Sequence, residues 1–223
     1  LINEVLEVQN PDNFFELLRQ NRVLVKRHER KDKIESLINQ ASKSLNLKPD
    51  ISEGLLNELV DLVEWPELIV GKFSTEFLDL PLEVLSTVMK SHQRYVPLLL
   101  KNNSFSKLDL SSEKNISTSF FVISNGLEES NENIAKGNEK VLRARFSDAK
   151  FFVESDKKVA SIKRNEKLKS VSYIKGLGNI FQRVERIVEV SKKIFIFLND
   201  NSLEDKIIIE AAKYCKNDLC SEI

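Results

Sequence analysis

A change of periodicity near residue 125 constrains the fold more than any other feature of the chain. Up to the stretch TSFFVISNG, residues 118–126, apolar segments alternate between strand-like and helix-like spacing. After Asn125 and Gly126 the spacing becomes helical and stays so. Strands mixed with helices, followed by helices alone, are typical of an α+β domain joined to the beginning of a helical one. We therefore expect an α+β chain with domains over residues 1–165 and 166–223.

Apolar spacing, turn residues and prolines place the individual elements. We expect strands over residues 1–8, 22–26, 67–73, 94–100 and 118–126. We expect helices over residues 10–20, 27–45, 50–62, 80–92, 134–158, 179–198 and 203–221. The Asn/Ser/Lys-rich segment Lys101–Ser117 has no periodicity and is predicted to be a loop or insertion.

Composition narrows the class of protein. Hydrophobic residues make up 41% of the chain and charged residues 30%, which is typical of a globular protein with a core. Lysine plus arginine equals aspartate plus glutamate, at 34 each, so a basic contact surface has to be local. The two cysteines, Cys215 and Cys220, lack histidines at ligand spacing, so no metal site is expected. With no signal peptide and no long apolar run, we expect a cytoplasmic protein without membrane contact.

The helix expected over residues 134–158 carries many charges beside a core-like apolar set. On a wheel with 100° per residue, Phe146, Ala149 and Val153 fall within about 40° of Leu142. We expect this arc to face the core and Lys140, Arg143 and Lys150 to face solvent. Arg145 falls inside the apolar arc, between Phe152 and Ala149.

An arginine on a buried stripe requires a partner, because an unpaired buried charge is costly. One interpretation is an internal ion pair of Arg145, with Asp148, Glu139 or a carboxylate elsewhere. The other is a phosphate clamp, with Gly137 allowing close approach of a ligand to the backbone. The sequence leaves both open.

A second polar group, Lys90, His92 and Arg94, lies where a helix is expected to end and a strand to begin, next to Tyr95. A histidine in the last turn of a helix is explained by the helix dipole, so we assign His92 no catalytic role. The group is either a solvated edge or a contact with an RNA backbone.

Several motifs together resemble one family. These are VEWP (residues 63–66), HQRY (92–95), FFVISNG (120–126) and GNEKVLRARFSDAKFF (137–152), in an order that matches along nearly the whole chain. The chain resembles the β subunit of bacterial heterotetrameric glycyl-tRNA synthetase. Because that subunit is far longer, and because the chain lacks an initiator Met and ends inside a helical pattern, we expect an internal piece of it.

The resemblance implies a division of labour between subunits. In this family the α subunit carries the catalytic core and uses ATP with Mg²⁺, whereas the β subunit supplies tRNA contacts and is required for charging. The matched region resembles a domain type of the phenylalanyl-tRNA synthetase β subunit, followed by the start of a helical HD-like domain. No His-Asp pair occurs in this chain, so the ligands of a metal phosphohydrolase are missing from it.

The resemblance implies a non-catalytic part of the synthetase that binds no cofactor itself and has the α subunit and tRNA(Gly) as partners. The alternatives are an editing-type hydrolytic domain and a pure subunit-assembly module. Editing is unattractive because a pocket that fits glycine already excludes larger side chains. The candidate nucleic-acid contacts are Lys90, His92, Arg94, Lys136, Lys140, Arg143, Arg145 and Lys150.

Overall fold

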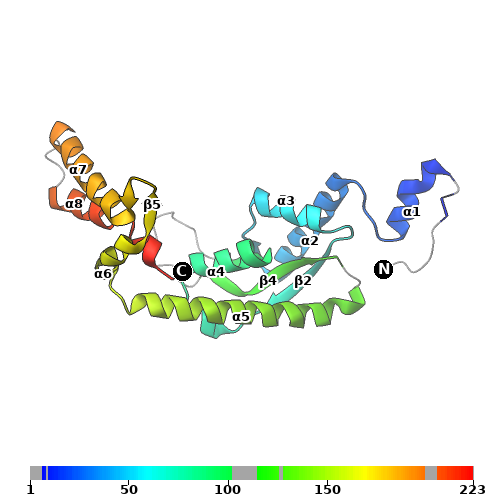
Figure 1. The fold of residues 1–223 in the computed structure, drawn as a ribbon. Coiled ribbons are helices and arrows are strands. Elements are labelled where there is room, and N and C mark those ends of the chain that lie inside the picture. The colour runs from blue at the N-terminus through cyan, green and yellow to red at the C-terminus, as the bar shows by residue number, and fades with distance from the viewer. Residues whose placement is uncertain (1–6, 9, 102–114, 126–127, 199–204, 223) are drawn as a thin grey trace. The chain divides into compact units, whose positions relative to one another are not determined.

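The computed structural model describes residues 7–8, 10–101, 115–125, 128–198 and 205–222 (Figure 1). Contacts divide the chain into two compact units, Leu1–Asp148 and Ala149–Ile223. The expected α+β class is confirmed. The domain ranges 1–165 and 166–223, with their family-based domain types, stay predictions.

The first unit contains a four-stranded antiparallel sheet in the order β1-β3-β4-β2. Its strands are β1 (Leu47–Pro49), β2 (Glu67–Lys72), β3 (Val96–Leu100) and β4 (Ile116–Ser124). Its helices are α1 (Phe14–Gln20), α2 (Arg27–Leu45), α3 (Glu53–Leu62) and α4 (Leu82–Thr87), with the short turns η1 (Pro11–Asn13), η2 (Thr75–Phe77), the π-turn η3 (Val88–His92) and η4 (Glu128–Ser130). The long helix α5 (Asn131–Lys157) begins in this unit.

Side chains alternate between the two faces of the sheet, and each face is covered. On one face, the sheet residues Val96, Leu98, Phe121 and Ile123 form a core with α2 and α3. On the other, Tyr95 stacks on Phe120 with ring centroids 5.0 Å apart. Figure 1 shows α2 and α3 on one side of β2 and β4, and α5 on the other.

The part of helix α5 that belongs to the first unit packs against the rest of that unit through aromatic contacts and hydrogen bonds. The ring of the buried Phe146 lies 5.1 Å from that of Phe73 and 5.4 Å from that of Phe77. The Tyr95 hydroxyl donates a 2.5 Å hydrogen bond to Asn138 Oδ1, and burial raises the pKa of this tyrosine. These contacts fix which face of α5 points away from the sheet.

The second unit contains a small helical core. Its elements are the C-terminal part of α5, α6 (Ser161–Arg164), η5 (Asn165–Ser170), β5 (Ser172–Ile174), β6 (Gly178–Asn179), α7 (Ile180–Leu198), α8 (Asp205–Tyr214) and η6 (Asn217–Cys220). Leu168, Ile180 and Val184 are buried together. Arg164 pairs with Asp156 at 2.9 Å.

Several sequence expectations are wrong. Residues 22–26 form no strand: the Leu24 N–H donates to the Glu64 carbonyl, and the segment remains outside the sheet. The segment LKP, expected to be a break, is strand β1. Residues after 125 are not helical throughout, because β5 and β6 form a hairpin around Gly176 and Gly178, which have φ values of 85° and 82°. Residues 1–6 of the strand expected over residues 1–8, and most of the loop expected over residues 101–117, lie outside the described residues.

Candidate nucleic-acid interface

A shallow hollow of about 380 Å³ lies where the end of β2 meets α5. Its lining side chains come from the β2–η2 segment and from one face of the helix: Lys72, Phe73, Ser74, Lys136, Glu139, Lys140 and Arg143. We call this surface the basic hollow, because four of its residues are cationic and only Glu139 is acidic. All four cationic residues are exposed.

The packing of α5 explains why its cations gather here. Leu142 and Phe146 are fully buried, which turns the opposite face of the helix outward. Lys136, Lys140 and Arg143 are spaced i, i+4 and i+7, so they share that outward face. The structure therefore brings together three of the residues expected from the sequence to contact nucleic acid.

Two hydrogen bonds shape the basic hollow. The backbone N–H of Lys72 donates to Glu139 Oε1 at 2.8 Å, which joins the end of β2 to α5. Lys136 Nζ lies 2.7 Å from Glu132 one turn earlier on the helix. Lys72, Lys140 and Arg143 have no ion pair within the described part of the chain. Their charges are therefore available to an anion from outside.

Sequence reasoning missed Lys72 and Glu139. Lys72 ends a strand with alternating burial, so its outward direction could have been predicted from ELIVGK. Its proximity to α5 could not, because that depends on the packing of Phe146 against Phe73 and Phe77. The sequence suggests Glu139 only as a partner for Arg145.

The structure does not bury Arg145, which corrects the sequence expectation. Its side chain is exposed and makes no ion pair among the residues that the structure describes. The buried arc of α5 is narrower than expected: Leu142, Phe146, Ala149 and Val153 are buried, whereas Phe152 is exposed by 38%. No internal partner is needed for a solvated guanidinium, so the buried ion pair is wrong.

The group at the end of η3 is largely paired with carboxylates. Lys90 Nζ lies 2.6 Å from Asp50 Oδ2, and Arg94 Nε lies 3.2 Å from Glu58 Oε2. Arg94 adopts a left-handed backbone with φ of 56°, and His92 is exposed. Lys150, expected to face solvent, is half-buried and belongs to the unit Ala149–Ile223.

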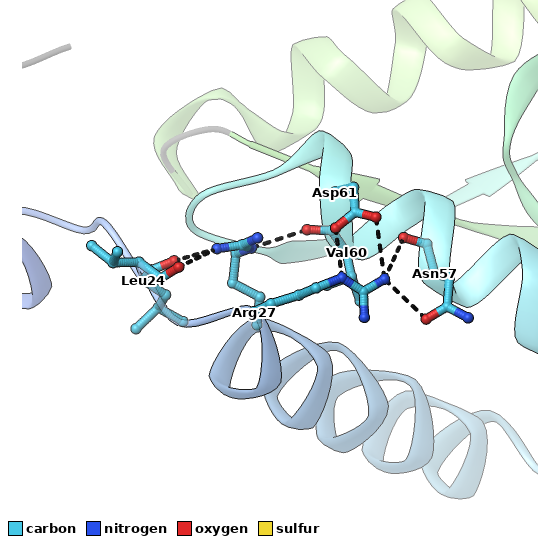
Figure 2. A network of polar contacts seen from close by, with 7 residues as sticks. Leu24, Arg27, Asn57, Val60 and Asp61 are labelled. Atoms are coloured by element: carbon cyan, nitrogen blue, oxygen red, sulfur yellow. Dashed lines mark hydrogen bonds and ion pairs between the residues drawn. The ribbon is translucent and has the colours of Figure 1, made fainter.

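Another arginine cluster, at the start of α2, has a structural role. Figure 2 shows Arg27 reaching toward Asp61 and Asn57 of α3. Arg27 donates to both carboxylate oxygens of Asp61, at 2.8 and 3.1 Å, and this hydrogen bonding holds the pKa of Asp61 below its ordinary value. Arg30 donates to the carbonyls of Leu24, Val25 and Val60, so it joins the segment before α2 to the end of α3.

Within the described ranges, no cluster of three or more His, Cys, Asp or Glu side chains could hold a metal ion. None of the helices described there is long and apolar enough to cross a bilayer. The fold and the hollow thus define an α+β module that presents a local cationic surface on a neutral chain.

Comparison with known proteins gives the family. The family model for the glycyl-tRNA synthetase beta subunit matches residues 1–223. The chain is 38% identical over 220 residues to the glycine–tRNA ligase beta subunit of Trichodesmium erythraeum, covering 99% of this chain and 30% of that protein. It is 34% identical over 223 residues to that of Halothermothrix orenii, covering 100% and 31%, and 33% identical over 218 residues to that of Bacillus subtilis, covering 98% and 30%.

The chain belongs to the glycyl-tRNA synthetase beta subunit family. It spans about 30% of the length of the curated relatives it matches.

Proposed function

We propose that the chain is part of the β subunit of a heterotetrameric glycyl-tRNA synthetase and supports ATP-dependent attachment of glycine to tRNA(Gly). The family match over all 223 residues carries this proposal. The β subunit works in the cytoplasm with an α subunit, which holds the catalytic core and uses ATP with Mg²⁺. The contribution of this chain is tRNA contact and scaffolding, and we assign it no catalytic residue or cofactor.

The cationic side chains divide by their availability for tRNA contact. Lys136, Lys140 and Arg143 are the main proposed contacts, because they line one hollow and are exposed. The remaining candidates are His92 and Arg145, which are exposed, and the half-buried Lys150. Lys90 and Arg94 are weaker candidates, because each would have to break its ion pair, with Asp50 and Glu58 respectively, before it could bind a phosphate.

A pure assembly module is the alternative, and the second unit offers an observation in its favour. The C-terminal half of α7 exposes large apolar side chains, including Ile196 at 75% and Phe197 at 87%. Apolar patches of this kind mark protein–protein contacts. Salt-dependent tRNA binding distinguishes the two functions, because only a phosphate-contacting surface releases counterions.

Glycine charging tests the proposed function. The α subunit is assayed for charging of tRNA(Gly) alone and with the β subunit that carries these 223 residues. We expect charging only with both subunits. We also expect no glycine-dependent pyrophosphate exchange by the purified chain alone, and such exchange would place catalytic chemistry in this chain and contradict the proposal.

A further inference from the structure

The basic hollow offers more positive charge than its own carboxylates neutralise. Lys72, Lys140 and Arg143 lack an ion-pair partner among the described residues. Lys136 forms an ion pair with Glu132 of the same helix. Elsewhere in the first unit, Lys31, Lys90 and Arg94 each pair with a carboxylate from a different element. Lys43 and Lys48 of the same unit are also exposed and without an ion pair among the described residues, so the basic hollow is distinguished by having three such cations line one place.

The geometry of the cations fits a row of anions better than a single one. Lys136 and Arg143 are seven residues apart on α5, which corresponds to roughly 10 Å along the helix axis at about 1.5 Å per residue. One phosphate group is too small to reach both ends of such a row, whereas a nucleic-acid strand presents a phosphate at every nucleotide.

The lining also indicates which part of a nucleic acid would be contacted. Phe73 is the aromatic residue of the lining, and it is buried with its ring against Phe146. No exposed ring is therefore offered for a base to stack on within the hollow. Cationic side chains without an aromatic platform are typical of backbone contacts, which position an RNA without reading its sequence.

We propose that the basic hollow binds consecutive phosphates of one RNA strand, and the contacting side chains are Lys72, Lys136, Lys140 and Arg143. This inference rests on the proposed function, because tRNA is the RNA that such a subunit meets. It adds a contacting residue from β2 and limits the interaction to the sugar-phosphate backbone.

Glu139 is the positioning residue of this site. Its Oε1 accepts the hydrogen bond from the Lys72 N–H, so it holds the end of β2 against the cationic face of α5. Its negative charge, however, opposes an approaching phosphate. Glu139→Gln keeps an oxygen acceptor and removes the charge, so it should tighten RNA binding. Glu139→Ala also removes the acceptor and should bind less tightly than Glu139→Gln.

The test is titration of the full chain with a labelled tRNA(Gly) transcript at salt concentrations between about 50 and 200 mM. For Lys140→Ala/Arg143→Ala we expect the slope of log K against log salt to become shallower by about 2, which is about one for each lost phosphate contact. The matched control is Lys43→Ala/Lys48→Ala, which removes two exposed lysines of the same unit that are far from the lining residues in sequence. We expect this control to retain the original slope.

Further measurements separate the possible outcomes. Circular dichroism checks that each variant is folded, and inorganic phosphate at low millimolar concentration serves as a competitor. Displacement of the RNA by inorganic phosphate would show a single-phosphate site and overturn the inference. Equal slopes for the two double variants, or weaker binding by Glu139→Gln than by the parent, would also overturn it.

Absence of tRNA binding by the unsubstituted chain would overturn the basic hollow as an RNA site. The proposed function is judged separately, since charging by the two subunits together does not depend on where the RNA lies. Charging without binding by this chain would leave scaffolding as its role.

Discussion

Replacement of Phe146 by alanine tests how the cationic face of α5 is positioned. Phe146 has 0% exposure, and its ring contacts those of Phe73 and Phe77, with centroids 5.1 and 5.4 Å away. Burial of such a side chain is worth about 1.5–3 kcal/mol, and the cavity left behind raises the cost of truncation to about 3–5 kcal/mol. Since a domain is stable by only about 5–15 kcal/mol, the loss is large.

Urea unfolding followed by tryptophan fluorescence measures this loss in the correct unit. The single tryptophan, Trp65, belongs to the unit Leu1–Asp148, so its emission reports on that unit. Its indole Nε1 donates to Glu67 Oε1 at 3.0 Å, and Lys33 Nζ lies 3.5 Å from its ring centroid. Both contacts are lost on unfolding. At a urea slope of about 2 kcal/mol/M, Phe146→Ala should lower the midpoint by about 2 M.

Val141→Ala is the matched control on the same helix and in the same unit. Val141 is exposed by 44%, so its replacement should change the free energy of unfolding by less than about 1 kcal/mol. A midpoint for Phe146→Ala that is unchanged from the parent would refute the packing argument. An equal loss from Val141→Ala would show that the two positions are not distinguished by burial.

Three further predictions concern single positions. Gly71→Ala places a methyl group 2.5 Å from Phe120 Cζ, and we expect a destabilisation of about 1–3 kcal/mol by thermal unfolding; an unchanged Tm would contradict the close approach. Arg145→Ala should change the free energy of unfolding by less than about 0.5 kcal/mol, because the side chain is exposed. A loss of stability several times larger would support a buried ion pair of Arg145 instead. The hydrogen bond with Arg27 lowers the pKa of Asp61 in the folded state below its value in the unfolded chain. The ionised carboxylate therefore contributes its full stabilisation above the pKa of the unfolded chain. This stabilisation is lost as the pH falls through the lower pKa of the folded state. The stability difference between the parent and Asp61→Asn should thus be constant from about pH 5 to 7 and shrink below about pH 4, and a difference independent of pH would contradict the assignment.

The sequence predicted the elements whose own periodicity is long enough to read. Helix α2 was expected over 27–45 and is observed as Arg27–Leu45. Strands β2, β3 and β4 were expected from apolar or β-branched runs and are observed at those places. Most of the side chains that give the periodicity are buried, such as Ile34 and Ile38 of α2, whereas Leu45 at the end of that helix is 41% exposed.

Elements decided by tertiary partners were missed. Strand β1 has only three residues, and Leu47 is placed by its antiparallel partner Leu100. A proline at its end is tolerated because β1 is an edge strand. Conversely, the segment around Leu24 contains β-branched residues but forms no strand. The Arg30 side chain donates hydrogen bonds to the carbonyls of Leu24 and Val25, and the Leu24 N–H donates to the Glu64 carbonyl, so these groups are not available to a neighbouring strand. Periodicity cannot show such partners.

The candidate site was predictable in part for the same reason. The spacing of Lys136, Lys140 and Arg143 puts them on one helix face from sequence alone. Which face of α5 packs, and how wide the buried arc is, depends on what covers the helix. The arc ends before Phe152, which is 38% exposed, so Arg145 lies outside it.

Charging kinetics of the complete synthetase test the central claim most directly. The measurement compares the KM for tRNA(Gly), and the rate of glycine-dependent pyrophosphate exchange, between the parent complex and one carrying Lys140→Ala/Arg143→Ala in the β subunit. We predict a raised KM for tRNA(Gly) that becomes more pronounced with salt. We also predict an unchanged exchange rate, because we propose that glycine activation takes place on the α subunit. An unchanged KM, or a loss of exchange together with charging, would contradict the assignment of this surface to tRNA contact.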